Sequence, residues 1–181
     1  MTIFLSGGAK CGKSTLAQKL ALTLAQGEKH YYVATMISSG EEDDARIRRH
    51  IADRAGMGFE TVECFQNILD CLDVADQTGT FLVDSVTSLM QNALFPAEKH
   101  YEMDIPAAQR CAEELAVFAK TVTNAVFVSD HIYADAQRYD AATEAYRKCL
   151  ADADRLLSSV CDTVVEVSAG QNIIYKGALP L

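Results

Sequence analysis

The sequence predicts an α/β fold in which a mostly parallel sheet carries helices on both faces. Short apolar runs alternate with longer stretches of helical periodicity along the 181 residues, as in consecutive strand–helix–strand units. A glycine-rich turn directly follows the first apolar run, where such folds commonly bind phosphate groups. No Gly/Ser linker, low-complexity tract or internal repeat divides the chain, so we expect residues 1–181 to form a single domain.

Strands are expected at the apolar runs Ile3–Ser6, Tyr31–Thr35, Phe81–Asp84, Ala125–Ser129, Thr163–Val167 and Asn172–Tyr175. Helices are expected between them, near Lys13–Ala25, Glu41–Ala55, Cys64–Ala75, Ser85–Leu94, Ala107–Val122 and Ala136–Val160. Asp104 as an N-cap and Pro106 in the first turn predict where the fifth helix begins. The last run follows Ala169-Gly170, which predicts a short antiparallel edge hairpin at the C-terminus.

Composition and charge exclude several classes of function. A hydrophobic content of 49% with 23% charged residues is ordinary for a soluble globular protein. No apolar run approaches the ~18 residues of a membrane span, and no basic segment followed by a long apolar core is present, so we expect neither a span nor a signal peptide. The net charge of −9 argues against a nucleic-acid partner, because phosphate backbones require clustered Lys and Arg.

The six cysteines show no C-x-x-C pair and no regular spacing. We therefore expect reduced thiols and a cytoplasmic location in preference to a zinc site or a disulfide framework. Cys11 lies inside the glycine-rich turn, where alkylation would block ligand binding through its bulk.

The glycine-rich turn satisfies the phosphate-binding pattern G-x-x-x-x-G-K-[ST] through Gly7, Gly12, Lys13 and Ser14. Glycines let successive backbone N–H groups converge on a triphosphate, and the following helix adds its positive N-terminal end. Lys13 supplies a charge to the outer phosphates, and the Ser14 hydroxyl is suited to ligate Mg²⁺. The sequence therefore predicts a P-loop NTPase-type three-layer fold that binds a nucleoside triphosphate.

A second part of the nucleotide site is expected at Asp84, the carboxylate that ends an apolar strand. In phosphate-loop proteins such a residue holds Mg²⁺ or its water opposite the loop serine. An Asp at this place also commonly caps a helix, a duty that Ser85 could share, but the upstream loop favours the metal role. The carboxyl end of the preceding strand should lie at the same ligand-binding edge and comprises Ala34, Thr35 and Met36.

Three basic side chains recur every four residues on the second expected helix: Arg46, His50 and Arg54. On one helix face they would present two guanidiniums and an imidazole to a phosphate group. A solvated face, with these side chains turned toward acidic neighbours such as Glu42, is an equally open interpretation of the periodicity.

These motifs resemble the bifunctional adenosylcobinamide kinase / adenosylcobinamide-phosphate guanylyltransferase family of cobalamin synthesis. In that family the loop reads G-G-x-x-S-G-K-S, the next strand ends in A-T, and an acidic stretch leads to R-I-x-x-H-x-x-x-R and then W-x-T-x-E. This chain matches in register at Gly7-Gly8 through Ser14, Ala34-Thr35, Arg46-Ile47, His50, Arg54, Thr61 and Glu63. Further matches to the family are Asp84, Thr87, Asn92, Leu94, Tyr146-Arg147 and Ala169-Gly170.

The chain departs from the family pattern at a few positions. Phe59 stands where the family has Trp, Ala55 where it has Pro, and Asp154 where Asn is usual. The segment Ser129–Tyr133 stands where the family carries S-N-E-V-G, so Asp130 replaces Asn and His131 replaces Glu. The changes in this segment lie at the end of a central strand and bear on the corrinoid side more than on nucleotide binding. We expect His131 to be a packed or capping residue near the pocket.

The resemblance implies two reactions at one nucleotide pocket. In the kinase reaction the terminal phosphoryl group passes to the aminopropanol hydroxyl of adenosylcobinamide. In the second reaction a histidine that corresponds to His50 attacks the α-phosphate of GTP, and the GMP–histidine intermediate gives adenosylcobinamide-GDP. The family also implies a homotrimer in which a neighbouring subunit helps to wall the active site.

Pattern and resemblance together yield a set of site residues. The catalytic residues are His50 and Lys13, and Ser14 and Asp84 are expected to hold Mg²⁺. The nucleotide-binding residues are Gly7, Gly8, Ala9, Lys10, Cys11, Gly12, Lys13, Ser14, Ala34, Thr35, Met36, Arg54, Glu63 and Asp84. Glu63 either reads guanine N–H donors or assists the metal.

The substrates implied are GTP or ATP and a corrinoid small molecule. Two other functions stay open at this point. One is a different P-loop small-molecule kinase or NTPase that has no covalent histidine. The other is a diverged nucleotide-binding paralogue without corrinoid activity.

Overall fold

The computed structural model describes residues 1–180 and contains one seven-stranded sheet in the order β3-β2-β4-β5-β1-β6-β7. Its strands are β1 Thr2–Gly7, β2 His30–Ala34, β3 Glu60–Glu63, β4 Thr80–Asp84, β5 Asn124–Asp130, β6 Thr163–Ser168 and β7 Gln171–Lys176. All neighbours pair in parallel except β6 and β7, which form the antiparallel edge hairpin. The predicted fold class is therefore confirmed.

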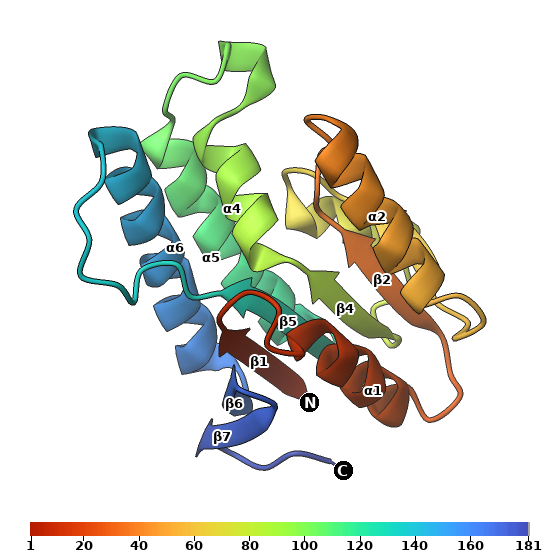
Figure 1. Cartoon of the computed structure of the whole chain (residues 1–181). Coiled ribbons are helices and arrows are strands. Elements are labelled where there is room, and N and C mark those ends of the chain that lie inside the picture. The colour runs from red at the N-terminus through yellow and green to blue at the C-terminus, as the bar shows by residue number, and fades with distance from the viewer. Residues whose placement is uncertain (181) are drawn as a thin grey trace.

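The helices are α1 Lys13–Ala25, α2 Glu41–Asp53, α3 Cys71–Val74, α4 Val86–Leu94, α5 Ile105–Thr121 and α6 Ala141–Val160, with short 3₁₀ turns η1 Ile68–Asp70 and η2 Ala97–Lys99. In Figure 1, α4, α5 and α6 stand together as one layer, and α1 lies apart from them on the sheet. No helix within residues 1–180 has both the length and the apolar character that crossing a bilayer would require.

Two separate cores hold the three layers together, because successive side chains of a strand point to opposite faces of the sheet. On one face Leu5, Leu82 and Val126 pack with Leu20 of α1. On the other face the strand aromatic side chains pack against α4, α5 and α6, and they include Phe4, Phe81 and Phe127. This double burial explains why the central strands read as continuous apolar runs.

Several predicted boundaries are confirmed by local capping. α1 begins and ends at the expected residues. Asp104 accepts a hydrogen bond from the Ala107 N–H and caps α5, with Pro106 in its first turn. Ser85 accepts from the Ser88 N–H and caps α4, so Asp84 is free of that duty.

The predicted helix Cys64–Ala75 is wrong over its first half. Residues 64–67 form an irregular turn instead, and only η1 and the single turn α3 are helical. The Cys64 N–H donates to the Ala34 carbonyl of the neighbouring strand, and Asn67 has an extended conformation. These tertiary contacts override the helical periodicity.

Two further expectations differ from the structure. No strand was expected at β3, since this exposed edge strand packs only through Val62 and has no apolar run. α6 begins at Ala141 and not at Ala136, because Asp140 caps it by accepting from the Ala142 and Thr143 N–H groups.

The parallel register brings the carboxyl ends of the strands to one edge of the sheet. Gly7 at the end of β1 is paired with Asp130 at the end of β5. Ala34 at the end of β2 lies between Glu63 of β3 and Asp84 of β4. Residues far apart in the chain therefore meet in one row.

Helix α2 is held only loosely above this edge. None of its residues is buried, and it makes little contact with any other helix or strand. Gly40 precedes it, and Gly56 and Gly58, both with positive φ, follow it. Figure 1 shows α2 standing away from the α4–α6 layer.

A buried carboxyl group lies beneath the end of β5. Asp154 of α6 accepts hydrogen bonds from Ser129 Oγ at 3.0 Å and Tyr133 Oη at 2.8 Å, both at Oδ2, while its Oδ1 is buried without a partner. Burial, with a smaller contribution from Asp130, raises the pKa of Asp154 from 3.8 to about 7. Below about pH 7 the folded protein thus prefers the protonated form of this side chain.

We predict that Asp154→Asn flattens the pH dependence of stability. Because the folded pKa lies above the unfolded one, the wild-type chain loses stability as pH rises from about 4 to 7, and the loss persists above that range. Between pH 5 and pH 8 the free energy of unfolding of the wild type should therefore fall, relative to that of the variant, by on the order of 2 kcal/mol. Urea unfolding of both proteins at the two pH values measures this gain, and an equal difference at both would contradict it.

Candidate active site

The phosphate loop has the backbone conformation that its glycines predict. Gly12 has φ 98° and precedes α1 as its N-cap, and Lys10 has φ 60°. No acidic residue lies in the first turn of α1, so the positive end of the helix stays available for an anion. Gly7 is required by contact, because a Cβ there would lie 2.4 Å from the Val167 carbonyl oxygen of β6.

The Lys13 ammonium is buried against its own loop. Its Nζ donates to the Gly7 carbonyl at 3.0 Å, to the Gly8 carbonyl at 2.6 Å and to Asp130 Oδ1 at 2.7 Å. A buried cation is stable only when it is paired and hydrogen-bonded, and Asp130 supplies the charge that pairs it. A bound triphosphate would offer the same ammonium other anionic oxygens.

Asp84 lies at the end of β4 between Tyr32 and His50. Tyr32 Oη donates to Asp84 Oδ2 at 3.1 Å, and His50 Nδ1 of α2 lies 3.9 Å from the same oxygen. Burial, followed by the negative charge of Asp84, raises the pKa of the Tyr32 hydroxyl, so it stays a donor. The His50 Nδ1 atom is buried and has no hydrogen-bond partner within the described residues.

The basic face of α2 is directed toward the sheet edge. The Arg54 guanidinium lies 4.0 Å from the centre of the Tyr32 ring, and its Nη2 donates to Thr61 Oγ1 at 3.3 Å. Arg46 lies on a cavity wall, and across residues 1–180 neither arginine forms a salt bridge. Within this part of the chain, these side chains therefore do not pair with acidic neighbours such as Glu42.

A cavity of about 890 Å³ opens between α2, α4 and the turn after β3, and it adjoins the phosphate loop through Asp130, which pairs with Lys13. Its walls carry groups of both charges and neutral polar groups, among them Arg46, Glu63, Thr87, Asn92 and Asp130, and they include the apolar side chain of Met36. This volume lies in the upper part of the range that is typical of small-molecule sites.

Two side chains of α4 hold the cavity wall in place. Asn92 Nδ2 donates to the Thr35 and Phe65 carbonyls, both at 2.9 Å, and so joins the ends of two segments. Thr87 Oγ1 accepts from the Asp130 N–H at 2.8 Å, and the Thr87 carbonyl accepts from Tyr146 Oη at 2.9 Å. Thr87, Asn92 and Tyr146, which match the family pattern, therefore each have a structural role.

The sequence of this chain matches the model of one protein family. The model of the family described as cobinamide kinase / cobinamide phosphate guanyltransferase matches residues 3–174, nearly the whole chain. This chain belongs to that family. Members of the cobinamide kinase family act on a corrinoid and a nucleoside triphosphate, which agrees with a phosphate loop beside a large cavity.

Two solved structures are similar to this chain over most of its length. The flagellar accessory protein FlaH from Methanocaldococcus jannaschii is 13% identical and is similar over 97% of this chain and 78% of its own, with a TM-score of 0.45. A Pyrococcus horikoshii OT3 protein from a structural study is 9% identical over 97% of this chain and 86% of its own, with a TM-score of 0.54. At such identity the second likeness extends to the fold alone. No curated protein matches the sequence at a significant level.

The oxygen atoms expected to hold Mg²⁺ suit that ion chemically. Ser14 is half-buried at the start of α1, and its hydroxyl takes part in no hydrogen bond within residues 1–180. Tyr32 occupies only Oδ2 of Asp84, which leaves Oδ1 without a donor in the same part of the chain. Hard oxygen ligands such as these are what Mg²⁺ prefers.

The remaining expected residues differ in how they are placed. Ala9 and Lys10 are exposed on the loop, and Cys11 is partly exposed with its Sγ 3.6 Å from Lys13 Nζ. Thr35 is fully buried, and its Oγ1 donates to the Ser85 carbonyl and accepts from the Ser85 N–H. The structure thus gives its hydroxyl a packing role between β2 and β4.

His131 does not line the cavity and lies near β6 instead. The backbone N–H of His131 donates to the Gly7 carbonyl, and the ring Nδ1 lies 4.0 Å from Glu166 Oε1 of β6. Sequence reasoning gave more weight to this histidine than to its neighbour Asp130. Only the strand order, which places β5 directly beside β1, reveals that Asp130 contacts Lys13.

We predict that Gly7→Ala and Gly8→Ala differ sharply in stability. The new Cβ at Gly7 meets the backbone of β6 and lies 3.0 Å from Cys11 Sγ, whereas nothing lies within 4 Å of a Cβ at Gly8. Overpacking of this kind costs about 1–3 kcal/mol. Denaturant unfolding should show such a loss for Gly7→Ala and almost none for Gly8→Ala, and equal losses would contradict the predicted contact.

Proposed function

We propose that this chain is a bifunctional adenosylcobinamide kinase and adenosylcobinamide-phosphate guanylyltransferase that works through a GMP–His50 intermediate. The observation that carries the proposal is the row of groups along one sheet edge. The phosphate loop ends β1, Asp84 ends β4, and the His50 imidazole of α2 lies beside Asp84. Both reactions would thus use the same nucleotide pocket, each with its own triphosphate molecule.

In the phosphoryl-transfer reaction the protein acts mainly through position and charge. Loop N–H groups, the start of α1 and Lys13 would surround the outer phosphates and stabilise the charge that spreads over them. Ser14 and Asp84 would hold Mg²⁺, which neutralises negative charge on the phosphate oxygens when bound. The aminopropanol hydroxyl of the corrinoid would enter from the cavity.

In the guanylyl-transfer reaction a nitrogen of His50 attacks the α-phosphorus of GTP. A P–N bond forms while the P–O bond to pyrophosphate breaks, and pyrophosphate leaves with that electron pair. An oxygen of the corrinoid phosphate then attacks the same phosphorus, and the P–N bond breaks to release His50. The product is adenosylcobinamide-GDP.

Arg46 of α2, Arg54 directly after this helix and the charged cavity wall support this assignment. Arg46 on the cavity wall and Arg54 over Tyr32 place positive charge on both sides of His50 in a chain whose net charge is −9. Anionic phosphates of either substrate are attracted to such a local excess. The loose packing of α2 and the glycines around it allow His50 to approach the phosphate loop and withdraw.

We predict that GTP labelled at the α-phosphate transfers its label covalently to the wild-type protein, and that His50→Asn abolishes the transfer. The linkage should be a phosphoramidate, which is labile in acid and stable in alkali. Denaturing electrophoresis of the washed protein measures the retained label. Lys13→Ala should also lose it, because the triphosphate is no longer held.

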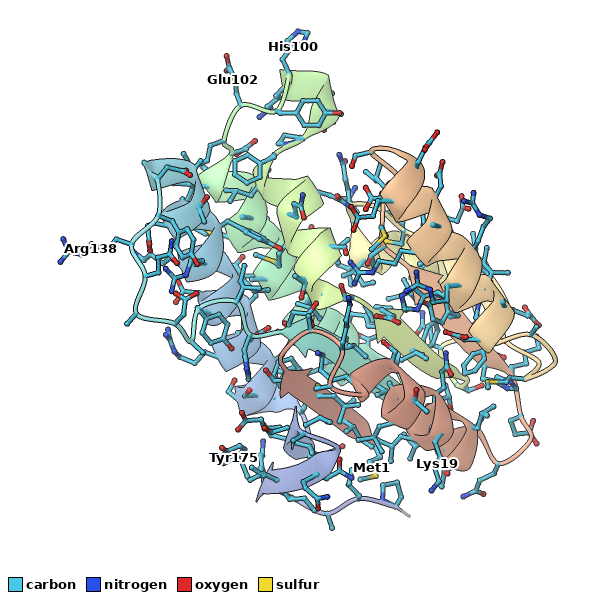
Figure 2. All side chains as sticks on the ribbon, in the orientation of Figure 1. Met1, Lys19, His100, Glu102, Arg138 and Tyr175 are labelled. Carbon is cyan, nitrogen blue, oxygen red and sulfur yellow. The ribbon has the colours of Figure 1, made fainter. Side chains whose placement is uncertain are left out.

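His100→Asn is the matched control for the histidine variant. His100 is exposed at the tip of the segment after α4, far out from the sheet in Figure 2, and its φ of 54° suits Asn. This variant should label like the wild type. Label that persists in His50→Asn, or a GTP-binding wild type that takes no label, would contradict the covalent mechanism.

A second candidate is favoured by the segment at the end of β5. Asp130 and His131 stand there in place of the Asn and Glu that the family carries, next to the phosphate loop. A small-molecule kinase without a covalent histidine would tolerate such a change. It would transfer the terminal phosphoryl group undiminished in His50→Asn but not in Lys13→Ala.

A further inference from the structure

Asp130 lies at the boundary between the phosphate loop and the cavity. It ends β5 in register with Gly7, its Oδ1 contacts Lys13 Nζ, and it lines the cavity wall. We propose that the Asp130 carboxylate is a catalytic group of the phosphoryl transfer, which orients the acceptor hydroxyl and takes its proton. This inference rests on the kinase half of the proposed function.

The backbone of Asp130 is fixed from two sides. Its N–H donates to Thr87 Oγ1 at 2.8 Å, and the His131 N–H that follows donates to the Gly7 carbonyl at 3.2 Å. Tyr146 Oη, by donating to the Thr87 carbonyl, ties this arrangement to α6. A carboxylate on so constrained a backbone is pre-positioned, as a group that must meet a reacting atom requires.

The side chain itself has capacity for a second partner. Within residues 1–180, Lys13 is the only donor to the Asp130 carboxylate. It donates to Oδ1, and Oδ2 of Asp130 makes no hydrogen bond in this part of the chain. The side chain is 22% exposed, whereas that of Lys13 is 5% exposed. A ligand can therefore reach this ion pair from the side of Asp130.

Nucleotide binding would release this carboxylate for chemistry. The terminal phosphate attracts the N–H groups of Lys13, which in the structure are shared between Asp130 and the Gly7 and Gly8 carbonyls. An acceptor hydroxyl in the cavity must approach the terminal phosphate close to Lys13. The Asp130 carboxylate lies on that route and accepts the O–H hydrogen bond.

The step is balanced without any further reactant. The acceptor oxygen forms a bond to the terminal phosphorus, and the bond from phosphorus to the bridging oxygen breaks. The nucleoside diphosphate leaves with that electron pair. The proton of the acceptor hydroxyl passes to the Asp130 carboxylate and from there to water.

The family pattern has Asn at this position and Glu at the next, which His131 replaces here, so Asp130 is the carboxylate that this segment retains. Asparagine has nearly the same shape as Asp and accepts a hydrogen bond but takes no proton. The variant Asp130→Asn therefore separates proton transfer from packing. It retains an oxygen for Lys13, so the fold should persist, and thermal unfolding checks this. The matched control is Asp152→Asn, whose carboxylate is exposed and pairs only with Arg155 within the described residues.

We predict that Asp130→Asn lowers kcat for phosphoryl transfer to adenosylcobinamide by on the order of 100-fold. The KM for the nucleotide should stay unchanged or fall, because a negative charge next to the phosphates is removed. Covalent labelling of His50 by GTP, which needs no acceptor hydroxyl, should stay at the wild-type level. Asp152→Asn should match the wild type in all three measurements.

Three results would overturn the role of Asp130. A kcat within about twofold of the wild type would leave Asp130 as a counter-ion of Lys13 alone. Equal losses of phosphoryl transfer and of His50 labelling would indicate general damage to the nucleotide site. A wild-type protein that labels at His50 but phosphorylates no adenosylcobinamide would refute the kinase half of the proposed function, and the role of Asp130 with it.

Discussion

The parallel register of β1, β2, β4 and β5 is the constraint on which the whole site depends. Because these strands run in one direction, their carboxyl ends meet at one edge, and each ends in a residue of the site. The edge holds Gly7, Ala34, Asp84 and Asp130. Buried apolar side chains on both faces of the sheet lock the register, so packing far from the chemistry sets the distances within it.

Charge is distributed unevenly around this edge. The chain is acidic overall, yet the phosphate loop, Lys13, Arg46 and Arg54 gather positive charge where phosphates would bind. Asp130 balances the charge of Lys13, with 2.7 Å between Oδ1 and Nζ, and Asp84 Oδ2 lies 3.9 Å from His50 Nδ1. Lys13 and His50 thus each have a carboxylate within reach, whereas Arg46 and Arg54 form no salt bridge within residues 1–180. A buried ammonium such as that of Lys13 is stable only when it is paired in this way.

Local spacing predicts the loop, α1 and the capped start of α5, because those features depend on neighbouring residues. Local spacing fails to predict structure where contacts between residues far apart in the sequence determine it. The turn at Cys64 is held by the Ala34 carbonyl, and β3 is an edge strand with too few apolar residues to recognise. The pairing of Lys13 with Asp130 follows from the position of β5 between β1 and β4, an order that no local pattern encodes.

The central claim is that one triphosphate, cradled by the loop, lies within reach of His50. A crystal structure of the chain with Mg²⁺ and a GTP analogue that cannot be cleaved at the α-phosphate tests this most directly. We expect Lys13 at the outer phosphates and a His50 nitrogen about 3–3.5 Å from the α-phosphorus, as a group poised to attack requires. A bound analogue with His50 remote from that phosphorus in every protomer would contradict the claim.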